Sequence, residues 1–401
     1  MLYFTKGKCD CTGCGACASI CPMHCITMRK DSEGFLYPIA SDACVHCGKC
    51  QRVCPIESNR LIEKNERIEQ SAFCAVTKNK SVWKRSASGG AFSEICRAFA
   101  NQDTIICGAA WDGLRVHHVC VEGIDKINVL CKSKYVASDT ENVFSEIIKY
   151  IENGKKVIFC GTPCQVSGLR KAIGKKTENL LCIDLICHGV GSPDVFIACM
   201  EQLGKQLGGK VTAYEFRAKR SAYETDHIQS TDLSDGKKIY LYNDPYIQLF
   251  LDQLCLRPSC GKHCRFRCEQ RTGDITIADF KGLTNVYPFL TGSKKNYSSI
   301  IFNTEKGLDL LSTLQKNMVM YPCKIEDIKK YNPLFYKQTW FSEIRDVFFA
   351  EFTQDSTKAI MGHTKPVQLL HMSLKKRVWM ALPQFARKIV LTIFIRGGGN
   401  V

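Results

Sequence analysis

One cysteine pattern occurs twice in the first 55 residues, and it restricts what this chain can fold around. The pattern is Cys-x2-Cys-x2-Cys-x3-Cys-Pro, formed by Cys11, Cys14, Cys17 and Cys21, and again by Cys44, Cys47, Cys50 and Cys54. A 4Fe-4S cluster takes four thiolates, and three from one short loop leave the fourth to come from elsewhere. The spacing therefore predicts two clusters with exchanged fourth ligands. We expect Cys11, Cys14 and Cys17 to pair with Cys54, and Cys44, Cys47 and Cys50 to pair with Cys21.

Zinc knuckles and a disulfide-rich scaffold are the alternative interpretations of these cysteines. Zinc sites usually join two Cys-x2-Cys units across a longer gap, which this spacing does not match. Gly13, Gly15, Ala16 and Gly48 are small enough to let the backbone bend round a cluster and direct N–H groups at its sulfurs. Residues 1–56 resemble the bacterial two-cluster ferredoxins. The cysteines just outside the pattern, Cys9 and Cys25, are interpreted as free thiols.

Composition places the chain among cytoplasmic proteins. It has 401 residues and 25 cysteines, and residues 1–8 lack the apolar core of a signal peptide. Reduced thiols and iron–sulfur clusters both favour the cytosol. The net charge is +16, and residues 365–401 hold seven Lys or Arg and no Asp or Glu. No nucleic-acid-binding motif accompanies this charge, so nucleic acid is not expected as a partner.

The basic tail leaves two interpretations open. Leu369–Arg396 mixes apolar and basic residues, and its longest uncharged run is too short to cross a bilayer. One interpretation is an amphipathic helix that lies on the inner face of the membrane, with Trp379 and Phe394 as anchors. The other is a helix packed on the body of the protein with a solvated basic face.

The remaining sequence predicts an α+β fold whose main domain alternates strands and helices. Residues 57–71 are interpreted as a linker, and the apolar runs that follow as strands, among them Thr104–Trp111, Lys156–Cys160 and Leu180–Ile186. Helical patterns such as Asn142–Glu152, Pro193–Leu207 and Lys306–Gln315 lie between them. The expected units are a ferredoxin-type module (1–56), a linker (57–71), two parts of a flavin-binding α/β domain (72–160 and 161–330) and a helical basic extension (331–401).

Glycines, lysines and cysteines follow several of these runs, where an open α/β sheet binds its ligands. Ser88-Gly89-Gly90 precedes a helix and suits a phosphate or an ordinary helix cap. Lys132 and Lys134 are interpreted as ligands of a pyrophosphate or a flavin ring, or as residues of a solvated loop. Cys164, after Gly161-Thr162-Pro163, is either a metal ligand, a reactive thiolate or a buried apolar residue. Further thiols at Cys187, Cys260, Cys264 and Cys268 suggest a third metal cluster, although zinc would use similar ligands.

Six motifs recur in one order that resembles the coenzyme F-420 hydrogenase/dehydrogenase beta-subunit family over about residues 72–320. They are Ser88-Gly-Gly90, Ser133-Lys-Tyr135, Gly161-Thr-Pro-Cys-Gln165, Asp184-Leu-Ile-Cys-His-Gly189, Arg257-Pro-Ser-Cys260 and Asp274-Ile-Thr-Ile-Ala-Asp-Phe-Lys-Gly282. Two positions depart from the family pattern. The cysteine pair here is Cys260-x3-Cys264 instead of Cys-x2-Cys, and Ala278 and Lys281 stand where the family has Gly and Trp.

The resemblance implies a non-Rossmann FAD site, a further 4Fe-4S cluster and electron transfer between them. It makes Ser88, Gly89, Gly90, Lys134 and Thr162 candidates for the FAD site, and Cys164, Cys187, Cys260 and Cys264 candidates for the third cluster. Apart from the resemblance, His188 is interpreted either as a proton donor to the substrate or as a structural residue beside Gly189. The expected function is an FAD-dependent and iron–sulfur-dependent oxidoreductase, as in deazaflavin-using complexes or proteins of polysaccharide-biosynthesis gene clusters. Its partner would be a redox protein or a small electron donor or acceptor. An electron-relay subunit and a zinc protein that binds nucleic acid are the alternatives.

Overall fold

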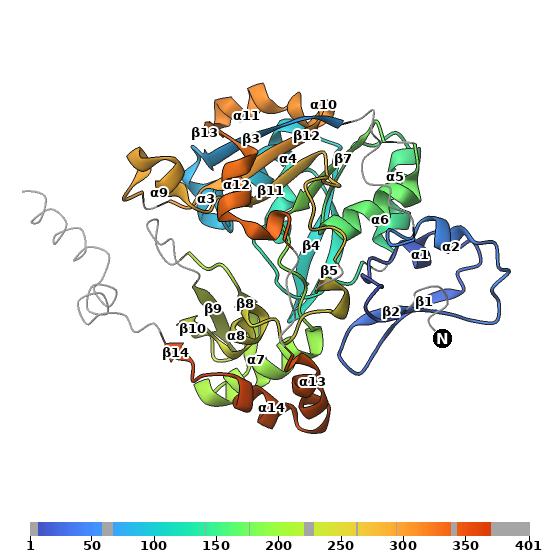
Figure 1. Ribbon diagram of the computed structural model, residues 1–401, viewed down its shortest axis with the longest axis vertical. Coiled ribbons are helices and arrows are strands. Elements are labelled where there is room, and N and C mark those ends of the chain that lie inside the picture. Colours follow the sequence, from blue (N-terminus) through green and yellow to red (C-terminus); the bar gives the residue numbers. More distant parts are fainter. Residues whose placement is uncertain are drawn as a thin grey trace, which may run out of the picture.

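The computed structural model describes residues 7–57, 67–140, 142–175, 177–219, 228–261, 264–293, 295–337 and 343–369. Within these residues the chain forms a large mixed sheet covered by helices, a smaller antiparallel sheet beneath it, and an N-terminal module at one side (Figure 1). This arrangement confirms the predicted α+β class.

The large sheet has the strand order β13-β3-β12-β11-β7-β6-β4-β5. Its neighbours β4, β6, β7 and β11 are parallel, and the strands on either side of this group are antiparallel. Strand β6 reads Val-Ile-Phe-Cys because a central parallel strand is buried on both faces. The strands are β3 (Arg67–Thr77), β4 (Ile105–Asp112), β5 (Arg115–Glu122), β6 (Val157–Cys160), β7 (Leu180–Leu185), β11 (Ile275–Asp279), β12 (Ser298–Thr304) and β13 (Met318–Cys323).

Helices cover both faces of this sheet. Helices α4 (Ala91–Phe99) and α11 (Leu311–Asn317), with the 3-10 helix η2 (Ile124–Leu130), pack on one face through residues such as Ile95 and Leu314. Helices α5 (Val143–Glu152) and α6 (Pro163–Ile173) pack on the other face, under β4, β6 and β7. Shorter helices complete this unit: α3 (Lys80–Arg85), α9 (Leu283–Val286), α10 (Glu305–Leu308) and α12 (Ile325–Tyr331).

The smaller antiparallel sheet has the order β14-β10-β9-β8 and shares a core with four helices. Phe196, Phe216, Tyr246 and Phe348 are buried in that core, which extends to Phe35 of the N-terminal module. The elements are α7 (Pro193–Leu207), β8 (Val211–Glu215), β9 (Gln229–Leu233), β10 (Lys238–Tyr242), α8 (Pro245–Leu251), α13 (Arg345–Gln354), α14 (Ser356–His363) and β14 (Gln368–Leu369).

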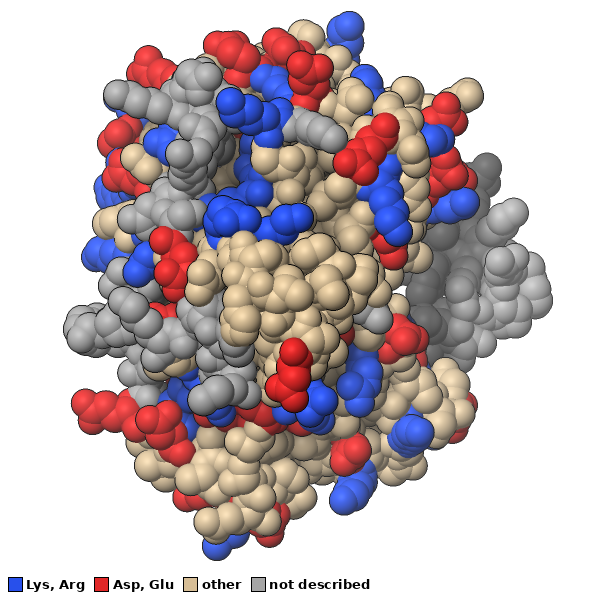
Figure 2. All heavy atoms as spheres, turned by 90° about the vertical axis from the view of Figure 1, so that its right-hand side faces the viewer, with Lys and Arg blue, Asp and Glu red and all other residues tan. Residues whose placement is uncertain are grey.

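The N-terminal module contains α1 (Ala16–Ser19), the hairpin of β1 (Ile26–Lys30) and β2 (Leu36–Ala40), and α2 (Lys49–Arg52). Figure 1 shows it beside α5 and α6, and Ala16 is fully buried in the core that these helices share with the sheet. Seen from that side, the molecule has a central area of uncharged side chains with charged residues around it (Figure 2). The module is therefore packed onto the main domain through the helix layer.

The predicted strands and helices agree with this fold, with two differences. Strand β3 begins at Arg67, inside the stretch 57–71 that was predicted as a linker, because its first residues pair with Thr304 of β12. The helix expected over 306–315 is divided into α10 and α11. The basic tail beyond residue 369 lies outside the described residues. No helix in the described part of the chain is long and apolar enough to cross a membrane.

Candidate functional site

The first thiol group consists of Cys11, Cys14, Cys17 and Cys54, and it joins the two ends of the module. Cys14 and Cys17 lie in the electrostatic field of both Cys11 and Cys54, so the four predicted partners are brought together. Burial raises the pKa of the Cys14 thiol to about 12, and the neighbouring cysteines contribute to this increase. Gly13 and Gly15 have φ values of 68° and 77°, which other residues rarely adopt. They turn the loop so tightly that three thiols face one space.

Side chains of the main domain donate hydrogen bonds to backbone carbonyls of the module and so attach the first thiol group to the main domain. Arg257 donates from Nε to the carbonyl of Cys11 and from Nη2 to that of Leu36, both at 2.8 Å. Thr140 Oγ1 donates to the carbonyl of Cys14 at 3.0 Å, and Lys171 Nζ donates to that of Cys54 at 3.1 Å. The guanidinium of Arg257 also lies 3.7 Å from the Cys11 sulfur. A cation therefore stands directly beside the first thiol group.

The second group surrounds a hollow at the outer end of the module. Cys21, Cys44, Cys47 and Cys50, the predicted partners, all line it, together with Cys25. The Cys25 sulfur lies 3.3 Å from that of Cys21. Cys25 was predicted to be a free thiol outside the repeat, and it lines this hollow as a free thiol.

A third group lies in a cavity between the module and the main domain. Cys164 begins α6 after β6, Cys187 follows β7, and Cys260 and Cys264 come from the loop before β11. All four line a cavity with an empty volume of about 1180 Å³, counting its open mouth. Parallel strands β6 and β7 end at the same edge of the sheet, which brings Cys164 and Cys187 together. Thr12 and Gly13 of the module line the same cavity.

The donor set of this cavity fits an iron–sulfur cluster. Burial raises the pKa of Cys187 and of Cys260 to about 12, and neighbouring thiols of the group contribute to this increase. Such thiols become stable thiolates when a metal centre supplies the positive charge. The Gly189 N–H donates to the Cys187 sulfur at 3.3 Å, as expected around a cluster ligand. Among the described residues, no three His, Cys, Asp or Glu side chains converge closely enough for a single metal ion.

The FAD-site candidates fall in two places. Ser88 Oγ donates to the Tyr297 carbonyl at 2.7 Å, and the Ser298 hydroxyl accepts from the Gly89 N–H at 2.9 Å. A Cβ at Gly89 would lie 2.3 Å from the Ala75 carbonyl, so glycine is required for this close approach. Gly90, with φ 95°, caps α4. This turn lies beside the sheet, and none of its three residues lines the thiol cavity.

Lys134 and Thr162 have different surroundings, although Lys134 acts electrostatically on Cys160, two residues before Thr162. Lys134 Nζ donates to the Cys131 carbonyl at 2.8 Å, and burial lowers its pKa to about 8. The loop of Lys134 reaches α4 through Cys131, whose sulfur lies 3.5 Å from Ser93 Oγ. Thr162 caps α6, and its hydroxyl lies 3.1 Å from the Cys164 sulfur in the thiol cavity. Lys134 is thus close to the helix that the Ser88–Gly90 turn begins, whereas Thr162 belongs to the third thiol group.

His188 packs at the rim of the third group. Its ring centroid lies 4.9 Å from that of Phe250, and its carbonyl accepts from Arg267 at 2.5 Å. Burial, with the positive charge of Arg267, lowers the pKa of His188 to about 4. The ring is therefore neutral at pH 7. The role of His188 as a proton donor stays a prediction.

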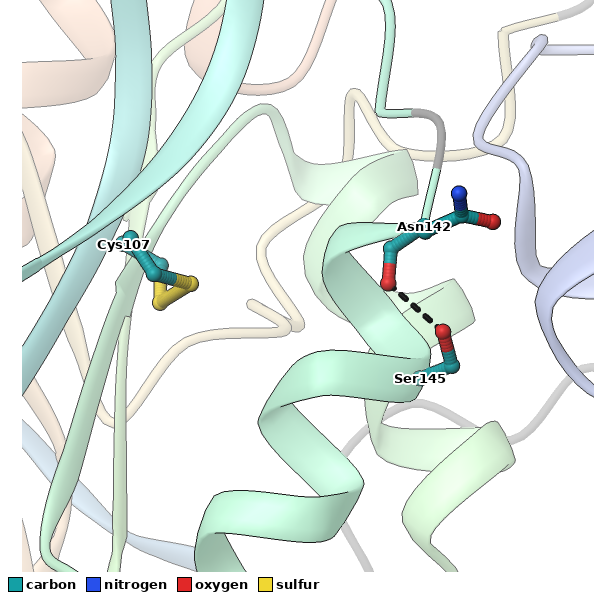
Figure 3. The surroundings of a disulfide bond; sticks show 4 residues. Cys107, Asn142 and Ser145 are labelled. Atoms are coloured by element: carbon teal, nitrogen blue, oxygen red, sulfur yellow. Dashed lines mark hydrogen bonds between the residues drawn. A yellow bond between two sulfur atoms is a disulfide. The ribbon is translucent and has the colours of Figure 1, made fainter.

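Two features of this region were not predicted from the sequence. Arg257 was noted only as part of a motif, although it is 3% exposed and binds the module. The second feature is a disulfide between Cys107 and Cys120, shown in Figure 3. The two cysteines are 13 positions apart, and the two strand-like runs joined by a short turn at Gly113 were the available signal that they face each other.

Two regions of the chain match known protein families. Residues 154–332 match the model for the C-terminal part of the beta subunit of coenzyme F420 hydrogenase/dehydrogenase, and residues 10–58 match that of the 4Fe-4S dicluster domain. A chain of the F420-reducing NiFe hydrogenase complex from Methanosarcina barkeri is similar in structure, with 16% identity and a TM-score of 0.44. That similarity covers 74% of this chain and 92% of the other. No curated protein matches the chain.

Proposed function

We propose that this chain, which carries a 4Fe-4S dicluster domain and the C-terminal region of the coenzyme F420 hydrogenase/dehydrogenase beta subunit, is an FAD-dependent oxidoreductase with three clusters. The observation that carries the proposal is the continuity of the thiol groups. Cys14 of the first group is close enough to Cys164 of the third to raise its pKa. Electrons that reach the module can therefore pass into the main domain without crossing solvent.

Cys164, Cys187, Cys260 and Cys264 would hold the third cluster. They come from three separate loops, and they share one cavity with the loop that carries Cys11 and Cys14. The Thr162 hydroxyl is in hydrogen-bond contact with Cys164, so we assign it to the surroundings of this cluster as well as to the flavin candidates. Cys260 ends the 3-10 helix Pro258–Cys260, and both Cys260 and Cys264 line the cavity.

The Ser88–Gly90 turn and Lys134 would hold the FAD. Support comes from the cationic surroundings of the turn, since Lys219 Nζ donates to the Ser88 carbonyl at 2.8 Å and Lys134 lies on the neighbouring loop. Cations and N–H groups of this kind suit the phosphates or the reduced ring of a flavin. A bound FAD takes up electrons in pairs and releases them singly, which connects a hydride donor to one-electron clusters.

The substrate of the proposed reaction is a deazaflavin coenzyme or another small molecule that exchanges hydride, as in proteins of polysaccharide-biosynthesis gene clusters. A redox partner protein would exchange electrons at the second thiol group, where Met23 is 48% and Val45 is 59% exposed. We place the protein in the cytoplasm. Contact of the basic tail with the inner face of the membrane stays a prediction, because the tail lies outside the described residues.

Anaerobic purification followed by iron, sulfide and flavin analysis tests the proposal. Three clusters require about twelve iron atoms per chain. Cys187→Ser should lower this to about eight, because the third cluster loses a ligand. Cys323→Ser is the matched control, since Cys323 is a partly buried free thiol on β13 and should leave the iron content unchanged.

The outcomes separate the candidate functions. Iron at the level of three clusters with one FAD released by acid supports the oxidoreductase. The same iron without flavin favours an electron-relay subunit that has no substrate site of its own. Iron that stays unchanged in Cys187→Ser would remove the third cluster from the proposal. A screen of donors and acceptors that includes the reduced deazaflavin coenzyme then identifies the substrate class.

A further inference from the structure

The Cys107–Cys120 disulfide joins two strands that are already paired. Cys107 on β4 and Cys120 on β5 are direct partners in a register of eight residue pairs that runs from Ile105 to Asp112. Figure 3 shows the bond on the side of the sheet where α5 lies. Every other cysteine in the described part of the chain is a free thiol. In proteins that keep their thiols reduced, a disulfide is more often catalytic or redox-sensing than structural.

The disulfide faces the same side of the sheet as the module. Cys107 is opposite Phe159 on β6, and Phe159 is opposite Cys182 on β7, so these residues and Cys120 form one row across four strands. Adjacent residues in register share a face of the sheet. This row belongs to the apolar core that also contains Cys14 and Val53 of the module.

Helix α6 connects that row to the first thiol group. A Cβ at Gly168 would lie 2.9 Å from the Cys14 sulfur, so this thiol rests directly on the helix. Val166 and Leu169 of the same helix are fully buried in the core with Cys107 and Phe159. The path from the first thiol group to the disulfide therefore passes through packed protein.

External thiols have poor access to this bond. Cys107 is fully buried, and Cys120 is partly buried on β5, the edge strand of the sheet. Thiol–disulfide exchange requires an attacking thiolate to approach a sulfur atom, so attack on the fully buried Cys107 is slow. Electrons that arrive through the protein do not need such access.

We propose that Cys107 and Cys120 form a redox-active couple that exchanges two electrons with the iron–sulfur clusters of the module. On reduction the S–S bond breaks, and each sulfur gains one electron and one proton to become a thiol. The electrons come one at a time from reduced clusters, which return to their oxidised state, and the protons come from solvent at the edge strand. The couple is an internal two-electron store, and it rests on the iron–sulfur part of the proposed function but not on the flavin.

The couple also has a structural connection to the third thiol group. Arg115, Val116 and His117 of β5 line the thiol cavity, and Cys120 lies three residues further along the same strand. Cys120 lies near the C-terminal end of the edge strand β5, and the N-terminal end of the same strand forms part of the cavity wall. The disulfide therefore lies on a strand that also lines the cavity.

Reductive titration of the full chain with its clusters and without added flavin tests this inference. The protein is purified anaerobically, oxidised, and reduced with dithionite, which is not a thiol. After denaturation and alkylation, mass spectrometry measures the cross-linked and the alkylated peptides of Cys107 and Cys120. We expect the cross-linked peptide to disappear on reduction and to return on reoxidation of the clusters, while Cys182, a buried free thiol in the same row, is alkylated throughout.

Two variants make the result specific. The double variant Cys107→Ser/Cys120→Ser should take up about two fewer electrons per chain than the natural protein, because the couple carries two. The double variant Cys11→Ser/Cys17→Ser lacks the first cluster and should keep its disulfide under the same treatment. A cross-linked peptide that survives reduction of the clusters, or that is lost equally fast without the first cluster, would overturn the proposal. Flavin content is not part of this readout, so failure here is distinct from failure of the flavin assignment.

Discussion

Replacement of Arg257 should change the reduction potential of the first cluster. The guanidinium is 3% exposed and lies 3.7 Å from the Cys11 sulfur, so its charge acts on the cluster with little screening. With an effective dielectric constant of about 20 and roughly 6 Å to the cluster centre, Coulomb's law gives about 3 kcal/mol for one added electron. This energy corresponds to about 0.1 V for a one-electron couple. Arg257→Gln should lower the potential by about that amount.

Arg257→Lys is the matched control for this experiment. The guanidinium of Arg257 donates hydrogen bonds to the carbonyls of Cys11 and Leu36, and neither a lysine nor a glutamine side chain can donate to both. Both variants should therefore lose one charge-assisted or buried hydrogen bond, which costs about 2 kcal/mol of the free energy of unfolding. Only glutamine also removes the positive charge. The two variants thus separate the electrostatic effect from the loss of packing.

Anaerobic redox titration followed by electron paramagnetic resonance measures the potentials, and urea unfolding measures the stability. We expect Arg257→Gln to shift one cluster and to leave the others near their original values, because the Arg257 guanidinium contacts a sulfur of the first thiol group. If the potential is the same in Arg257→Gln and Arg257→Lys, the cation does not act on a cluster held by Cys11. That result would refute the assignment of the first cluster to the loop beneath Arg257.

Three further changes test other parts of the structure. Gly168→Ala should lower the iron content and destabilise the fold by about 1–3 kcal/mol, because its Cβ would clash with the Cys14 sulfur. The control is Gly362→Ala, on a helix with open space around it, which should be neutral or stabilising by up to about 1 kcal/mol. Cys47→Ser should remove about four iron atoms per chain, whereas Cys9→Ser should remove none, as iron analysis would show. Burial lowers the pKa of His118 to about 4, so the unfolded chain binds a proton between pH 6.5 and 4 that the folded chain does not. Stability should therefore fall by about 2 kcal/mol between pH 6.5 and 5 in urea unfolding, and a His118→Gln variant should lack this part of the slope.

Local spacing was enough to predict the cluster-binding loops. The eight repeated cysteines indicated two thiol groups with exchanged fourth members, and the structure brings together Cys14 with Cys54 and Cys21 with Cys44 in that way. The alternation of strands and helices likewise predicted β4, β6 and β7, because burial on both faces of a parallel sheet leaves a continuous apolar run in the sequence. These features depend on residues that are close in the chain.

Contacts between distant residues decided the rest. Arg257 and Cys11 are 246 positions apart, and no local pattern relates them. The same holds for the separation of Thr162, which lines the thiol cavity, from the Ser88–Gly90 turn, which does not. The sequence by itself determined that the N-terminal module carries the cysteine ligands for two 4Fe-4S clusters. Only the tertiary packing decided that the third thiol group and the buried Arg257 guanidinium lie close to the first thiol group, since side-chain packing is set by tertiary contacts that local spacing does not encode.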